Sequence, residues 1–165
     1  MPADIKKFRL PRFHEIPDVG LYLDQTVKYI NSFLAPLGLS EITSSMVSNY
    51  VKKGYISNPV RKQYSAEQIA YLFGIVILKN VVSMENIPRL FSLQRTLYTT
   101  QVAYDYFCAE MENVLYYTFG LKDEADEIGT TTSTAKDMLR SVIIAVSHII
   151  FLNNRFYELE SEEAP

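Results

Sequence analysis

The sequence has little of what enzymes and metal sites use: one cysteine and two histidines in 165 residues. The single cysteine, Cys108, excludes an intramolecular disulfide and a cysteine cluster for zinc, while His14 and His148 lie most of the chain apart. No Gly-rich phosphate loop, GxSxG or HExxH pattern occurs. Glu110 and Glu112 do not share a helix face, which argues against paired carboxylate catalysis. We therefore expect no metal, no cofactor and no enzyme activity.

Long apolar runs are also scarce. The N-terminus lacks the apolar stretch of a secretory signal. The longest candidate membrane segment, residues 142–152, is shorter than the ~20 apolar residues that span a bilayer. Together with the single cysteine, these absences predict a reducing, cytoplasmic location and no membrane contact. The 48% hydrophobic and 21% charged residues are typical of an ordinary globular protein.

Each half of the chain is short of charge of one sign. Residues 1–64 carry nine Lys/Arg and five Asp/Glu, which gives a net charge of +4. Residues 65–165 carry seven Lys/Arg and fourteen Asp/Glu, a net charge of -7, so the whole chain has a formal charge of -3. The basic half permits a weak electrostatic footprint for nucleic acid, although the pI of 5.4 is well below that of a strongly basic binder. The acidic C-terminal end is typical of a solvated tail.

Capping residues and helical periodicity divide the chain. Residues 1–23 are expected to form an extended arm, broken by prolines, whose apolar side chains can pack on the helices after it. Asp24 is the expected N-cap of a first helix that ends by Pro36 and Gly38. Thr43 is expected to cap a second helix of about three turns, which Gly54 ends.

The remaining chain is predicted to hold four more helices, separated by short connections and one exposed loop. A Ser65–Gln68 capping box is expected to open a strongly amphipathic third helix that runs to about Asn80, and Ser83 to cap a short fourth helix. The fifth helix is expected from Thr99 to Phe119, before Gly120. The last is expected from Thr134 to about Asn154, after a loop over 122–133.

The last helix contains the run SVIIAVSHIIFL, residues 141–152, which is apolar almost all the way round. Such a helix has to be buried on most sides, within its own bundle or against a partner. We therefore expect a homodimer.

The first two helices, a small wing over 57–63 and the supporting third helix follow the order by which many proteins place a helix in the DNA major groove. If Val47, Tyr50 and Val51 face the core, the polar side chains of the second helix turn outward. Serine and asparagine can bond base edges or phosphates, and basic side chains attract phosphates. The expected DNA-binding residues are Ser45, Ser48, Asn49, Lys52 and Lys53 on the helix, with Arg61 and Lys62 on the wing. A lysine-bearing surface helix that is merely solvated is the alternative interpretation.

The run ITSSMVSNYVKKGYISNPVRKQYSAEQIAYLFGIVILKNVVSMENIPRLF resembles the DNA-binding head of MerR-type winged-helix regulators. In that family a helix ending in a tyrosine is followed by a glycine and two hydrophobic residues, a wing, a Tyr-Ser pair and another helix. The matching positions are Thr43, Val47, Tyr50, Gly54, Tyr55, Ile56, Tyr64 and Ser65, with 83–87 opening the next helix.

A further resemblance covers roughly residues 8–115. The segments LPRFHEIPDVGLYLDQTVKYIN, NYVKKGYI and KQYSAEQIAYLFGIVILKNVVSMENI are similar to an uncharacterised YkrK-type domain family of Gram-positive bacteria. That family has no established activity. What the resemblance implies is a MerR-like helix-turn-helix core and a regulator. MerR-type regulators often carry an effector-binding module after the head, which makes a small-molecule effector an expected partner by analogy.

We predict a mainly α fold, with a MerR-like winged helix-turn-helix followed by a C-terminal helical unit. The expected parts are an arm (1–19), the head (20–92), a helical dimerisation or effector unit (93–154) and an acidic tail (155–165). The predicted function is transcriptional regulation through double-stranded DNA. The alternative is a protein-interaction module on a winged-helix scaffold that does not bind DNA, favoured by Ser48 where an arginine is common in MerR-type heads, and by a wing that is short for that family.

Overall fold

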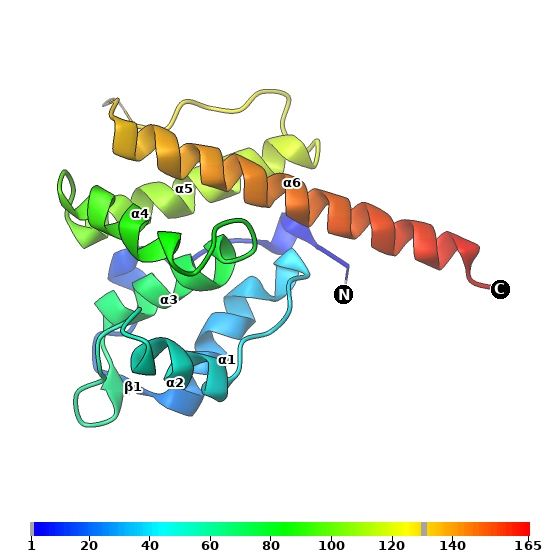
Figure 1. Ribbon diagram of the computed structural model, residues 1–165. Helices are drawn as coiled ribbons and strands as arrows, with labels where there is room; N and C mark the ends of the chain where they lie inside the picture. Colours follow the sequence, from blue (N-terminus) through cyan, green and yellow to red (C-terminus); the bar gives the residue numbers. More distant parts are fainter. Residues whose placement is uncertain (1, 130–131) are drawn as a thin grey trace.

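The computed structural model of the protein describes residues 2–129 and 132–165. This part of the chain is mainly helical, as predicted, with one two-stranded sheet (Figure 1). The antiparallel strands pair Leu21 with Tyr64 and Tyr22 with Gln63. The elements are the 3-10 helices η1 (Ile5–Lys7), η2 (Phe13–Glu15) and η3 (Ala35–Leu37), the strands β1 (Leu21–Tyr22) and β2 (Gln63–Tyr64), and the helices α1 (Leu23–Leu34), α2 (Ser44–Lys52), α3 (Ala66–Leu78), α4 (Asn86–Arg95), α5 (Thr100–Thr118) and α6 (Thr134–Glu163).

Two of the predicted helix starts are confirmed in atomic detail. The Thr43 hydroxyl accepts a hydrogen bond from the Met46 amide at 3.2 Å, which caps α2. Ser65 and Gln68 form a reciprocal capping box at α3, because Gln68 Oε1 accepts from the Ser65 amide at 2.9 Å and Ser65 Oγ accepts from the Gln68 amide at 3.2 Å. These bonds satisfy amides that the first turn of a helix leaves without partners.

Two other predicted caps are wrong. Helix α1 starts earlier than expected, with Tyr22 as the N-cap residue, and Asp24 lies in the first turn, where its charge favours the helix N-terminus. Helix α4 starts at Asn86, because Met84 and Glu85 form a separate turn between Ser83 and the helix. In the described residues, no side-chain hydrogen bond caps the start of α4. The Ser83 carbonyl accepts from the Asn86 amide instead.

Helix α3 forms the centre of the molecule. It was predicted to be strongly amphipathic, but it is buried on nearly every side, because α1 and η2 cover one part of it and α5 and α6 another. Phe73, fully buried, meets the rings of Tyr29 and Phe33 edge to face with centroids 6.1 Å apart in both pairs. The apolar core therefore runs continuously from the first helices to the last.

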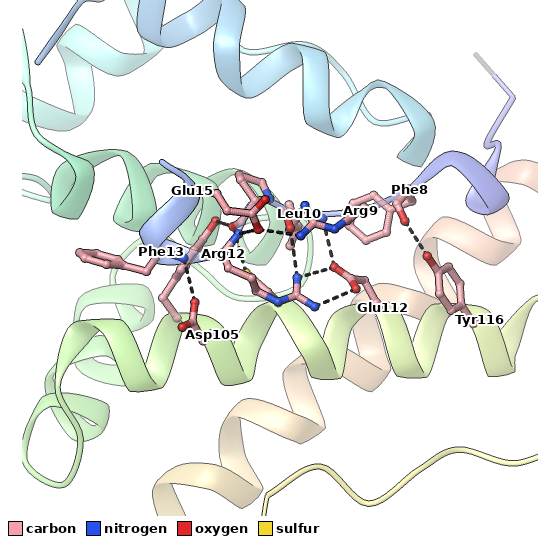
Figure 2. Close-up of polar contacts among 12 residues, drawn as sticks. Phe8, Arg9, Leu10, Arg12, Phe13, Glu15, Asp105, Glu112 and Tyr116 are labelled. Atoms are coloured by element: carbon pink, nitrogen blue, oxygen red, sulfur yellow. Dashed lines mark hydrogen bonds and ion pairs between the residues drawn. The ribbon is translucent and has the colours of Figure 1, made fainter. Parts of the chain in front are cut away.

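The N-terminal arm packs on the helices after it, as predicted, and lies along α5. It is not extended throughout, since η1 and η2 form two short 3-10 helices within it. Phe8, Leu10 and Ile16 are buried. Hydroxyl groups of α5 hold the arm backbone, since Tyr104 donates to the Pro11 carbonyl and Tyr116 to the Phe8 carbonyl, each at 2.7 Å. Figure 2 shows the bond from Tyr116.

We use the name arm clasp for the ion pair between Arg12 and Glu112, with the two backbone bonds beside it. The guanidinium donates to both carboxylate oxygens, at 2.7 and 2.9 Å, and the Leu10 amide donates to the same carboxylate at 3.1 Å. The Phe13 amide donates to Asp105 at 2.8 Å (Figure 2). The pKa of the Arg12 guanidinium is raised, and the hydrogen bond to Glu112 is the largest cause. In the arm itself, bonds from the Arg9 side chain and the Arg12 amide lower the pKa of Glu15 to about 2.

Helix α6 is longer than predicted. It continues past Asn154 to Glu163, so the expected acidic tail is mostly helical, and its C-terminal half extends beyond the rest of the molecule (Figure 1). Within the chain it is buried on one face only, through Leu139, Ile143 and Ile150 among others. Residues 122–129 and 132–133 of the predicted loop form neither helix nor strand, and residues 130–131 lie outside the described part. No helix in the described residues is both long enough and apolar enough to span a bilayer.

Candidate nucleic-acid interface

The connection between α1 and α2 sets where α2 begins. Gly38 follows η3 with φ +70°, a left-handed conformation that glycine adopts without steric cost. The Asn31 side chain then bonds both backbone groups of Ile42, donating to its carbonyl and accepting from its amide, each at 3.0 Å. One amide side chain on α1 therefore fixes the segment directly before the Thr43 cap.

Helix α2 divides its residues between the core and the surface as predicted. Val47 and Tyr50 are buried. Ser45, Ser48, Asn49 and Lys52 are exposed and stand at i, i+3, i+4 and i+7, which puts them on one face. The helix has nine residues, about two and a half turns at 3.6 residues per turn, and is slightly shorter than expected.

The C-terminal end of α2 closes in a Schellman motif, as Gly54 predicted. The Gly54 amide donates to the Val51 carbonyl at 3.0 Å and the Tyr55 amide to the Tyr50 carbonyl at 2.9 Å, with φ +78° at Gly54. Lys79, at the end of α3, donates to the Tyr50 hydroxyl at 3.2 Å. These contacts hold the end of α2 rigidly and leave Lys53 exposed.

Gln68 fixes the base of the wing, a role that sequence reasoning missed. Besides its capping bond, its Nε2 donates to the carbonyls of Ser57 and Asn58 and to Ser57 Oγ, each at 3.0 Å. The side chain is buried at 8% exposure. A glutamine three residues after a capping serine signals the cap, but the sequence carries no signal for the second contact, which depends on how the wing folds back.

The wing is a two-residue hairpin with basic residues at its tip. Val60 and Gln63 exchange both backbone hydrogen bonds, at 3.1 and 2.9 Å. The two residues between them, Arg61 and Lys62, have φ of +53° and +64° and are the non-glycine residues with positive φ in the described chain. A turn of this kind, as in type I′, normally carries Asn-Gly, because positive φ strains residues with a larger side chain.

We expect the double change Arg61→Asn and Lys62→Gly to raise the free energy of unfolding by about 1 kcal/mol, because it relieves the positive-φ strain. Urea unfolding followed by circular dichroism measures this. The matched control is Lys52→Ala with Lys53→Ala, which removes the same two charges from α2 and should change stability by less than about 0.5 kcal/mol. A double variant of the wing that is no more stable than the parent would contradict a strained turn.

The seven predicted contact residues are all exposed, and no hydrogen bond or ion pair joins their side chains to another described residue. Ser48 and Lys62 line the same surface hollow of about 460 Å³, so the structure brings α2 and the wing together. The hollow also contains Asp24 and Tyr22. The carboxylate of Asp24 makes this hollow unfavourable for a phosphate.

The cysteine, the histidines and the carboxylates are the other residue types that could form a site. The described part of the chain holds no group of three His, Cys, Asp or Glu that could bind a metal ion. Cys108 is buried, and desolvation raises the pKa of its thiol to about 12, so it is unreactive as a nucleophile. His148 is exposed on α6.

The fold and these contacts define a mainly helical protein in which a two-stranded sheet lies beside a short exposed helix. The chain belongs to the family described as Domain of unknown function (DUF1836), a model of which matches residues 11–107. The match starts in the arm and ends within α5, so α6 lies outside it. Membership of an uncharacterised domain family is thus confirmed. No curated protein and no solved structure matches the chain.

Proposed function

We propose that this protein is a cytoplasmic DNA-binding transcriptional regulator whose head is a MerR-like winged helix-turn-helix. The observation that carries the proposal is the pairing of two exposed features. One is the face of α2 formed by Ser45, Ser48, Asn49 and Lys52, and the other is the strained hairpin that presents two adjacent basic side chains. Strained backbone persists where the surroundings and a function require it.

The dimensions and chemistry of α2 suit a duplex. The major groove is about 12 Å wide, which admits a single helix. Ser45, Ser48 and Asn49 would bond base edges or phosphates, and Lys52 and Lys53 would supply the sequence-independent attraction to phosphates. Arg61 and Lys62 at the wing tip would contact the backbone beside the groove.

The direct test is selection of bound fragments from a genomic DNA library by the full chain, followed by titration of an enriched fragment over a range of salt concentrations. We expect enrichment of a common sequence and an affinity that falls steeply with salt. Enrichment of no fragment, and no salt-dependent shift of any fragment at low ionic strength, would refute the proposal.

The alternative function is protein interaction on a winged-helix scaffold that does not bind DNA. Asp24 and Tyr22 favour it, because an acidic and an aromatic side chain in the hollow beside α2 suit a peptide better than a phosphate. A partner protein that is displaced by substitutions in the Ser45–Lys53 face would support this function. Protection of a specific DNA sequence from nuclease digestion would exclude it.

Two further partners belong to the proposal. One is a second copy of the chain, which would allow two heads to read half-sites about 34 Å apart. The other is a small-molecule effector. Its best support is an apolar hollow of about 60 Å³ between α3, α4 and α5, with Tyr71, Arg95 and Thr100 among the residues that line it. A hollow of this size takes a small apolar group, and Arg95 beside it would favour a negatively charged substituent.

A further inference from the structure

A mostly exposed apolar stripe runs along α6. Its seven positions alternate in steps of four and three residues over three heptads, which is the a/d spacing of a coiled coil. We call it the α6 seam, and its residues are Met138, Val142, Ala145, Ile149, Leu152, Phe156 and Leu159.

The seam lies on a different face of α6 from the one that packs on the molecule. The rest of the chain covers Leu139, Ile143 and Ile150, which are at most 4% exposed. Five members of the seam are instead exposed: Met138 at 47%, Ile149 at 37%, Leu152 at 47%, Phe156 at 61% and Leu159 at 49%. The other two, Val142 and Ala145, are half-buried, and Val142 also packs against the edge of the core. Exposed apolar side chains in a contiguous row mark an interaction surface.

We propose that the seam binds the same seam of a second copy, and that the two α6 helices run antiparallel. This inference identifies the surface and orientation of the second-copy partner proposed above, and it does not depend on whether the head binds DNA. Strict heptad spacing fits another helix better than a flat lipid surface, because each seam residue then inserts between residues of the facing helix.

Charge selects the orientation. Residues 155–163 carry Arg155 against four glutamates, a net -3, whereas residues 134–140 carry Lys136 and Arg140 against Asp137, a net +1. A parallel pair would place the two acidic ends side by side. An antiparallel pair places each acidic end along the first turns of the facing α6, where the helix N-terminus adds a partial positive charge. The helix is therefore complementary to itself in the antiparallel arrangement.

Sedimentation of the full chain without DNA tests the seam. We expect a species of twice 18.9 kDa that Phe156→Lys converts to the monomer, with a rise in the dimer dissociation constant of about a hundredfold or more. The matched control is Ser161→Lys, which adds the same charge to the same projecting segment on the side away from the seam. A parent that is monomeric at about 100 µM, or a dimer that Phe156→Lys leaves intact, would overturn the proposal. Unchanged helical circular dichroism excludes unfolding as the cause.

Cysteine cross-linking tests the orientation. Ser141 and Arg155 are exposed, flank the seam on one side and lie at nearly equal distances from its midpoint near Ile149. In an antiparallel pair they face each other, so a mixture of Ser141→Cys and Arg155→Cys chains should form the mixed disulfide under mild oxidation. Rapid cross-linking of Arg155→Cys with itself would instead show a parallel pair and overturn the antiparallel assignment. The native Cys108 is buried and should not react.

Discussion

Replacing Arg12 by Met is expected to lower the free energy of unfolding by about 3 kcal/mol, because it leaves the Glu112 carboxylate without its bidentate partner. The two side chains are only 24% and 15% exposed, so water replaces the lost bonds poorly. For a protein of this size the loss corresponds to a fall in Tm of roughly 6–12 °C. Thermal and urea unfolding at neutral pH measure it.

A second arginine in the arm provides the control. Arg9 pairs with Glu15 at 2.6 Å, but both side chains are more exposed, at 54% and 36%. Because surface ion pairs contribute little, Arg9→Met should cost less than about 1 kcal/mol. Equal losses for Arg9→Met and Arg12→Met would mean that the arm clasp is no stronger than a surface contact, and that apolar packing alone holds the arm on α5.

Removing the four basic side chains of the candidate interface should have the largest effect on DNA binding. If Lys52, Lys53, Arg61 and Lys62 each neutralise one phosphate, their replacement by Ala lowers the slope of log affinity against log salt by about 3.6 and the affinity by about a thousandfold near 0.1 M salt. Fluorescence anisotropy with a selected fragment, repeated at several salt concentrations, gives both quantities.

The control variant has the same net charge. Lys6, Lys7, Arg9 and Arg89 are exposed and lie outside α2 and the wing, so their replacement by Ala removes four positive charges from other surfaces. We expect only a small change in affinity from these substitutions, through the weaker overall field. If both variants lost affinity equally, binding would depend on net charge alone, and the proposed interface would be wrong.

Local signals in the sequence predicted much of the fold. The caps at Thr43 and Ser65 and the terminating glycines Gly54 and Gly120 act through atoms within a few residues, so the sequence shows them directly. The end of α6 was placed nine residues too early, because the change from apolar to acidic residues suggested a tail. Glutamate, leucine and arginine favour helix, and no proline interrupts the segment before Pro165.

The candidate site was predicted in part. Three- and four-residue spacing identified the outward face of α2, and the Asn-Pro of the wing indicated a turn. The basic turn with positive φ was not foreseen, since its usual residues are Asn and Gly. The place of Asp24 beside Ser48 and the second set of bonds made by Gln68 were also missed, because both arise from contacts between elements.

The arm clasp also has a consequence for synthesis of the protein on the ribosome. Arg12 and Glu112 are 100 residues apart in the chain, so at about 5–20 residues per second Glu112 is added roughly 5–20 s after Arg12. During that interval Phe8, Leu10 and Ile16 have no α5 to cover them. The arm is therefore made before α5 but reaches its final position only afterwards, and the nascent protein carries an uncovered apolar segment until α5 has emerged.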